Sequence, residues 1–108
     1  MKKEIIIYHT REGYEPFIEW LNYLGDKIVT QRIWVRIDRI EQGNYGDHKR
    51  FYGIIELRMH FGKGYRLYCG EEGNKLVVLL VGGDKSSQSS DIKKAFEYWK
   101  DYYAQKEI

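Results

Sequence analysis

The chain has 108 residues, 43% of them hydrophobic and 31% charged, which predicts one globular domain with a single core. Aromatic residues make up 16% of the chain, and this excludes a disordered protein. A net charge of +2 says little about partners until its distribution along the chain is known.

The single cysteine, Cys69, excludes an internal disulfide and a cysteine-rich metal site. On an apolar strand it is predicted to be a small buried hydrophobic residue. The apolar run in residues 1–7 is too short for a signal peptide, and no small-residue cleavage site follows it. No segment approaches the roughly 18 apolar residues of a membrane span. We therefore expect a cytoplasmic protein.

The first half of the chain predicts a strand at 5–8, a loop at 9–13 and two helices. Pro16 suits the first turn of a helix and Gly25 its end, while Asp26 is a suitable N-cap for the second helix, which Gly43 ends. The second helix has an apolar stripe and a basic outer face, the latter formed by Arg32, Arg36 and Arg39. The short turn predicts an antiparallel helical hairpin.

The second half predicts a loop at 43–53, three strands and a final helix. Apolar and polar residues alternate over 54–61, a second strand follows at 65–69, and 76–81 is apolar throughout, as in a strand covered on both faces. Gly82-Gly83 is expected to break that strand. Serines at 86–90 and Asp91 begin the helix, which is expected to pack these residues inward: Ile92, Ala95, Phe96, Trp99 and Tyr103.

These elements give the order β-α-α-β-β-β-α. The predicted fold class is α+β, a single domain over residues 1–108, with the helical hairpin and the C-terminal helix on a mostly antiparallel sheet.

The chemistry of the predicted sheet centres on two arginines. Glu56, Arg58 and His60 share one face of a strand, and an antiparallel neighbour would place Arg66 beside Arg58, with Tyr68 at the rim. Like charges side by side on a sheet are destabilising, so an anion between them would explain the pair. The segment 48–66 has five basic residues (Lys49, Arg50, Arg58, Lys63 and Arg66) against the single acid Glu56.

Two interpretations of this face remain open. One is a solvated sheet face on which Arg58 pairs with Glu56 or another acid. The other is a phosphate-binding groove, because arginine binds phosphate through two hydrogen bonds and RNA sites combine such cations with aromatic rings.

The remaining candidate groups also have two interpretations each. His48 and His60 are either surface residues or acid–base groups, and neither has metal-ligand spacing. Lys85 is either a turn lysine or an anion-binding residue, where the first N–H groups of the last helix could also meet an anion. The neighbouring Gly82-Gly83-Asp84-Lys85 lacks the spacing of a phosphate loop.

The order of short motifs resembles a known family. The motifs are Gly46-Asp47-His48-Lys49, Glu56-Leu57-Arg58, Gly62-Lys63-Gly64-Tyr65-Arg66-Leu67-Tyr68, Leu79-Leu80-Val81-Gly82-Gly83-Asp84-Lys85-Ser86-Ser87-Gln88 and Asp91-Ile92. In this order and spacing, the chain from its first strand through Tyr102 is similar to the phage-derived Gp49 branch of the RelE/HigB toxins, often called addiction-module killer proteins.

The resemblance implies a microbial-RNase-like fold and an endoribonuclease that cuts mRNA in the ribosomal decoding site without a metal or other cofactor. Family catalytic positions fall on Arg58, Arg66 and Lys85, and an RNA-backbone position falls on Lys49. The well-studied RelE branch has a tyrosine on its last helix where this chain has Ile92, so tyrosine-based acid–base chemistry does not transfer. His48, His60, Tyr68 or Gln88 would have to replace it, unless electrostatics alone suffices.

From these residues we expect Arg58 and Arg66 to stabilise the charge that develops on the phosphate when the RNA 2′-hydroxyl attacks it. His60 is the candidate base. A further set is expected to hold RNA: His48, Lys49, Arg50, Lys63, Tyr68 and Gln88.

The expected partners are the ribosome, mRNA and a cognate antitoxin, often with a helix-turn-helix domain, so that contact with DNA is indirect; no membrane partner is expected. Two alternatives remain. One is a ParE-like gyrase-inhibiting toxin, and the other is a non-catalytic RNA- or protein-binding module of phage origin.

Overall fold

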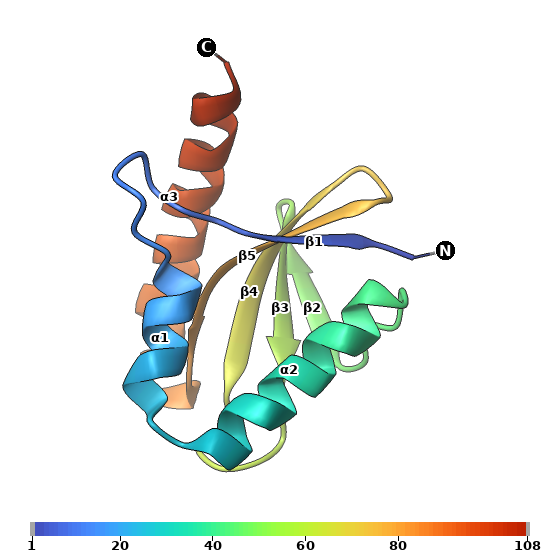
Figure 1. Cartoon of the computed structure of the whole chain (residues 1–108), viewed down its shortest axis with the longest axis vertical. Coiled ribbons are helices and arrows are strands. Elements are labelled where there is room, and N and C mark those ends of the chain that lie inside the picture. Colours follow the sequence, from blue (N-terminus) through green and yellow to red (C-terminus); the bar gives the residue numbers. More distant parts are fainter. Residues whose placement is uncertain (1, 108) are drawn as a thin grey trace.

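The computed structural model describes residues 2–107 and has the predicted α+β class (Figure 1). A mixed five-stranded sheet carries two helices on one face and the long C-terminal helix on the other. The elements are β1 (Glu4–Ile7), α1 (Pro16–Leu24), α2 (Lys27–Glu41), β2 (His48–Phe51), β3 (Ile54–Arg58), β4 (Arg66–Glu72), β5 (Leu76–Gly83), the 3-10 helix η1 (Lys85–Ser87) and α3 (Gln88–Lys106).

The strands lie in the order β1-β5-β4-β3-β2, with β1 parallel to β5 and the other pairs antiparallel. The expectation of a loop over 43–53 is wrong in part, because β2 forms there and pairs with β3. This strand, His-Lys-Arg-Phe, lies at the edge of the sheet and its first three residues are exposed. Charged side chains are common on an edge strand because they discourage pairing with another chain, and they also hide its strand character from a hydrophobic pattern.

The helix boundaries follow the local signals. Pro16 is the first residue of α1, and Gly25 ends it in a left-handed conformation with φ of 59°. The Asp26 carboxylate accepts hydrogen bonds from the backbone N–H groups of Ile28 and Val29 and thereby caps α2. The two helices diverge from this turn as an open V instead of the expected antiparallel hairpin (Figure 1).

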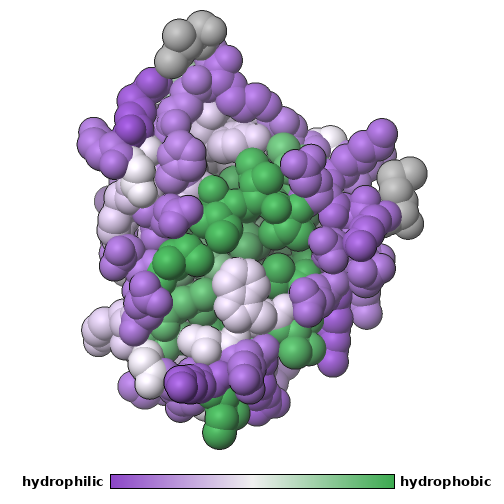
Figure 2. All heavy atoms as spheres, viewed as in Figure 1, coloured by the Kyte–Doolittle hydropathy of each residue, from purple (hydrophilic) through white to green (hydrophobic). Residues whose placement is uncertain are grey.

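The opening between α1 and α2 exposes apolar surface. In the same view, Figure 2 shows hydrophobic side chains gathered over the sheet between the two helices. The partly buried hydrophobic side chains that pack against the core on this face of the sheet are Ile5, Ile7, Ile18, Trp20, Leu24, Val29 and Phe61. Trp34 of α2 is 40% exposed.

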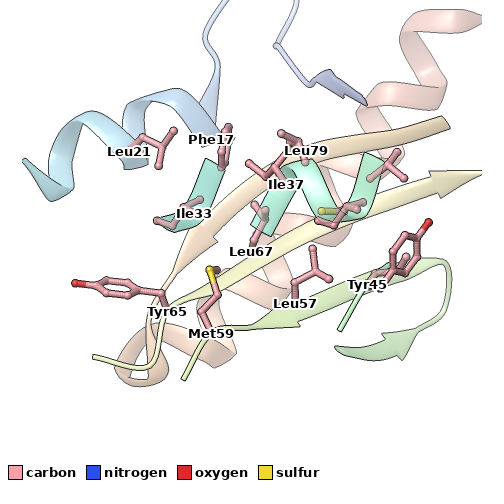
Figure 3. Close-up of a cluster of buried hydrophobic side chains, with 14 residues drawn as sticks. Phe17, Leu21, Ile33, Ile37, Tyr45, Leu57, Met59, Tyr65, Leu67 and Leu79 are labelled. Carbon is pink, nitrogen blue, oxygen red and sulfur yellow. The ribbon is translucent and has the colours of Figure 1, made fainter. Parts of the chain in front are cut away.

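Each face of the sheet has its own hydrophobic core. Under α1 and α2, Phe17, Ile33, Leu57, Leu67 and Leu79 are fully buried (Figure 3). Cys69 is buried in the same core, as predicted. The opposite core, under α3, contains Ile54, Tyr68, Val78, Leu80 and Ala95.

The last helix differs from the prediction at one position. Ile92, Phe96 and Trp99 pack inward as expected, whereas Tyr103 is 40% exposed. Tyr98 and Tyr102 also pack against this core. None of the helices in residues 2–107 is long and apolar enough to cross a bilayer.

The strand β5 continues through Gly82-Gly83, where a break was expected. A Cβ on Gly82 would lie 2.2 Å from the Trp20 ring of α1, and a Cβ on Gly83 would lie 1.7 Å from Oδ2 of Asp91 in α3. The two glycines therefore allow a helix on each face to pack directly onto the strand, and they do not mark a turn.

Candidate functional site

The buried carboxylate of Glu56 is the centre of the candidate site. Glu56 lies on β3 with 0% exposure, on the face that α3 covers. Its Oε1 accepts a hydrogen bond from Nε of Arg58 at 3.0 Å. Its Oε2 accepts from the Tyr68 hydroxyl at 3.0 Å and from Nε2 of Gln88 at 2.9 Å. Three elements, β3, β4 and α3, thus converge on one carboxylate.

Arg58 and Arg66 are direct partners across the antiparallel pair β3–β4, as the sequence predicted. The side chain of Arg58 is 33% exposed and that of Arg66 13% exposed. The negative charge of Glu56 beneath them offsets part of their mutual repulsion. The pairing of Arg58 with Glu56 is confirmed, but α3 covers Glu56, so this face is not the solvated one that the same interpretation assumed. The phosphate-binding groove stays a prediction.

Arg66 retains an unused hydrogen-bond donor. Its Nη1 donates to the carbonyl oxygen of Gly64 at 2.9 Å, whereas its Nε lies 3.7 Å from Oε2 of Glu56, too far for a hydrogen bond. Within the described residues this buried Nε has no hydrogen-bond partner. A buried donor without a partner is costly, so Arg66 is held beside Glu56 at a cost in free energy, through the attraction of opposite charges and not through a hydrogen bond.

The carboxyl of Glu56 stays ionised in this setting. Burial raises its pKa, but hydrogen bonds from Gln88, Arg58 and Tyr68 together with the Arg58 charge outweigh that effect, so its pKa lies below the usual range. Burial next to this carboxylate raises the pKa of Tyr68 far above its ordinary value, so the hydroxyl is a fixed donor. At neutral pH Glu56 is therefore a buried anion that orients the donors around it.

A cleft of about 510 Å³ opens beside the arginine pair. Its lining includes five residues of the β3–β4 region and η1 that the sequence singled out: Arg58, His60, Lys63, Arg66 and Lys85. We call it the cationic cleft. All four residues assigned as catalytic and one of those assigned to RNA binding, Lys63, are thus brought together.

His60 is paired with a carboxylate that the sequence analysis did not assign. Its Nε2 lies 2.5 Å from Oδ2 of Asp47, and the His60 side chain is largely exposed. The hydrogen bond with His60 lowers the pKa of Asp47. A carboxylate that holds one imidazole nitrogen orients the ring and leaves the other nitrogen for proton transfer.

Tyr68 and Gln88 were predicted to contact RNA, but they do not lie at the surface of the cleft. Tyr68 is fully buried and Gln88 is partly buried, and both donate to Glu56. The predicted RNA contact is wrong for Tyr68, because α3 covers that face of β4. For Gln88, which is the first residue of α3, the contact stays a prediction.

His48, Lys49 and Arg50 lie on the edge strand β2 and do not line the cationic cleft. Lys49 is the register partner of Glu56. Arg50 forms an ion pair with Glu71 at 2.8 Å on the other face of the sheet, which removes it from the cleft. Near Lys85, the backbone N–H of Ser86 is already satisfied, because Asp84 accepts a hydrogen bond from it at 2.8 Å.

Arg36 was expected on the outer face of α2, but it points inward. It donates to the backbone carbonyl oxygens of Tyr45, Asp47 and Arg58 at distances of 2.7–3.2 Å. These bonds tie the segment before β2 to the end of β3 and so position Asp47 and Arg58. No local pattern identifies such an arginine, because its acceptors are backbone atoms distant in the sequence.

Comparison with known proteins gave one relevant match. A protein of Haemophilus influenzae, described as an uncharacterized protein, is 46% identical over 80 residues, which cover 73% of this chain and 81% of that protein. No family model matches the chain, and no solved structure matches it. At this level of identity and coverage the chain belongs to the same family as the uncharacterized Haemophilus influenzae protein.

Proposed function

We propose that this protein is an endoribonuclease toxin of a type II toxin–antitoxin system, which cuts mRNA on the ribosome. The observation that carries the proposal is the cross-strand pair Arg58–Arg66 above the buried Glu56. The resemblance of the motif series to the Gp49 branch of the RelE/HigB toxins supports it independently. An RNase of this class works on a phosphodiester, and the cationic cleft offers the charge that such a substrate requires.

The reaction proposed is attack by the RNA 2′-oxygen on the adjacent phosphorus. The bond from phosphorus to the 5′-oxygen breaks, leaving a 2′,3′-cyclic phosphate and a 5′-hydroxyl. Negative charge grows on the phosphate oxygens as this occurs, and two guanidiniums held in place stabilise it without reorganising. Both arginines line the cationic cleft, where such a phosphate would lie. Lys85 and Lys63, which line the same cleft, would hold the neighbouring backbone.

Proton transfer falls to the His60–Asp47 pair. The 2′-hydroxyl loses its proton to the imidazole of His60, and the departing 5′-oxygen takes one from water. The imidazolium then gives its proton to the hydroxide so formed, which restores neutral His60 and water. Glu56 does not compete for this role because it is buried and its pKa lies below the usual range. Apart from water, the steps proposed use only side chains of this chain.

A toxin of this kind acts in the cytoplasm, where its ribosomes and mRNA are, and requires a neutralising antitoxin. The opening between α1 and α2 is apolar, and the cationic cleft is basic. An antitoxin that covers the cleft would present acidic groups to it.

The proposal is tested by primer extension on a defined mRNA in a purified translation system. Wild-type protein is expected to cut at codon boundaries only when ribosomes are present. Arg66→Ala and Lys85→Ala should abolish the cuts, whereas Lys2→Ala, which removes an exposed lysine outside the cleft, should not. Intact mRNA with folded wild-type protein would refute the proposal and direct attention to gyrase supercoiling or to a binding-only role.

A further inference from the structure

A second hollow, of about 840 Å³, lies where β5 ends between α1 and α3. The end of β5, from Val81 to Gly83, lines it, with Trp20 and Tyr23 of α1 and with Asp91 and Tyr98 of α3. We call it the tyrosine groove. Its volume lies within the range of small-molecule sites.

Aromatic rings are unusually accessible here. Tyr23 is 86% exposed and Tyr14 is 50% exposed, and both line the groove. The Trp20 ring packs directly on the backbone of Gly82, because a Cβ built on Gly82 would lie 2.2 Å from the ring. The strand beneath therefore fixes the position of the indole. Exposed tyrosines beside a fixed indole suit a planar ligand, since nucleobases stack on aromatic side chains regardless of sequence.

The tyrosine groove lies next to the cationic cleft. Lys63 and Tyr65 line both hollows, and a depression formed by Lys63, Asp84, Lys85 and Ser86 shares lining residues with each of them. A nucleic acid strand whose phosphate lies against Arg58 and Arg66 would therefore pass Lys63 and enter the groove with its next bases. Cations along a backbone path with aromatic rings beside it are the combination found in sites for single-stranded RNA.

The groove also holds a carboxyl group that Lys94 influences through its charge without forming an ion pair with it. Asp91 is 6% exposed, and its Oδ2 accepts a hydrogen bond from the Ser87 hydroxyl at 2.5 Å. Among residues 2–107 no lysine or arginine is ion-paired with it. A carboxyl oxygen is the acceptor that proteins offer to an exocyclic amino group of a base.

We propose that the tyrosine groove is a nucleobase subsite for the single-stranded RNA whose backbone occupies the cationic cleft. Tyr14 and Tyr23 stack on the bases, and Asp91 accepts a hydrogen bond from an exocyclic amino group. This inference rests on the proposed RNA substrate, but it does not depend on cleavage. It assigns to the groove the selection of bases next to the phosphate, which no residue of the cationic cleft provides.

The test measures binding separately from cleavage. A fluorescent six-nucleotide RNA with 2′-O-methyl groups cannot be cut, because the attacking hydroxyl is blocked, and its affinity is followed by anisotropy at low salt. We expect Tyr23→Ala to weaken binding about tenfold, the usual effect of losing one stacked base. Tyr52→Ala is the matched control, since Tyr52 is 95% exposed and lies on the turn between β2 and β3, outside the groove.

A series of oligonucleotides with one abasic nucleotide at each position identifies the stacked base. One abasic site should weaken binding to wild-type protein as much as Tyr23→Ala does, and should weaken binding to Tyr23→Ala no further. If Arg66→Ala reduces affinity but Tyr23→Ala and every abasic site leave it unchanged, the subsite is refuted and the groove is free for a protein segment. Absence of any binding to wild-type protein at millimolar concentration refutes it as well.

The two proposals fail separately. Base-dependent binding through Tyr23 in a protein that never cuts mRNA would support the subsite and refute the endoribonuclease function. Ribosome-dependent cleavage whose rate and choice of sites are unaffected by Tyr23→Ala and Asp91→Asn would support the function and refute the subsite.

Discussion

Arg58 and Glu56, two residues apart on β3, form an ion pair in which Nε donates to Oε1 at 3.0 Å while the carboxylate is completely buried. Residues at i and i+2 of a strand share a face, so the pair follows from the strand itself. The consequence is that one side of the Arg58 guanidinium is occupied and the arginine is held in one orientation beside Arg66. The site is therefore organised from beneath, by a group that no substrate can touch.

Glu56→Gln tests this organisation. The amide keeps the shape but loses the charge, so Arg58 and Arg66 are expected to repel each other and to lose their common orientation. We expect cleavage kcat to fall by about tenfold or more with a smaller change in KM, and the free energy of unfolding to fall by about 1–3 kcal/mol, as for a hydrogen bond to a charged group. Urea unfolding and single-turnover kinetics measure the two effects.

The matched control is Glu72→Gln, which removes a partly exposed ion pair with Lys106 far from the cleft. It should leave kcat unchanged and alter stability by less than about 1 kcal/mol. Because the pKa of Glu56 is lowered in the fold, its stabilisation is present above the unfolded-state pKa and is lost as pH falls through the folded-state pKa. The stability difference between Glu56→Gln and wild type should therefore shrink in acid; a difference that persists there would contradict the ionic role.

The His60–Asp47 pair predicts a second set of effects. His60→Ala should slow single-turnover cleavage by about 10²- to 10⁴-fold, the usual contribution of a general base. Asp47→Asn should cause a smaller loss, because the imidazole remains but is no longer oriented by a carboxylate. His9→Ala is the control, since His9 is exposed and does not line the cationic cleft. Unchanged cleavage by His60→Ala would exclude its role as base and leave electrostatic stabilisation as the mechanism.

Gly82→Ala is predicted to destabilise the protein. The new Cβ would lie 2.2 Å from Cε3 of Trp20, so the indole or the strand has to move, and overpacking of this kind costs about 1–3 kcal/mol. Adding Trp20→Leu should recover part of the loss, which a double-mutant cycle in urea detects. Gly73→Asn, where φ is 62° and a Cβ meets nothing within 4 Å, should have little effect. Equal destabilisation by both glycine substitutions would contradict the packing argument.

Asp91 predicts an opposite dependence on pH. Burial raises its pKa, and the hydrogen bond from Ser87 and the charge of Lys94 offset this only in part. The contribution of protonated Asp91 to the free energy of unfolding is therefore fully present below the unfolded-state pKa. It is lost as pH rises through the folded-state pKa. Asp91→Asn cannot ionise, so at pH 7 it should be more stable than wild type.

That gain should disappear near pH 3, where Asp91 is protonated in both states; thermal unfolding at several pH values measures it. Ser87→Ala provides a comparison, because it removes the hydroxyl that donates to Asp91 and should destabilise the protein instead. A wild-type protein more stable than Asp91→Asn at pH 7 would mean that the carboxylate has a favourable partner there. If Asp91→Asn stabilises the protein but weakens RNA binding, Asp91 is a residue kept for function at a cost in stability.

Local signals in the sequence were sufficient for the fold class, for most element boundaries and for the pairing of Arg58 with Arg66. Proline, glycine and aspartate at the ends of α1 and α2 act through neighbouring backbone groups, and strand alternation acts over two residues. The Gly62–Gly64 turn is short enough to set the antiparallel register in which the two arginines meet. Each of these features depends on a few residues that are close in the sequence, so the sequence pattern predicts them.

The burial of Glu56, the inward direction of Arg36, the pairing of His60 with Asp47 and the strand β2 were not predictable in this way. Gln88 reaches Glu56 from 32 residues away, and Arg36 bonds to carbonyl groups up to 22 residues away. A polar residue on a strand is ordinarily predicted to face solvent. The packing of α3 against the sheet instead buries Glu56 and Tyr68 completely. Which polar groups are buried depends on what covers them, and that is a property of the assembled layers.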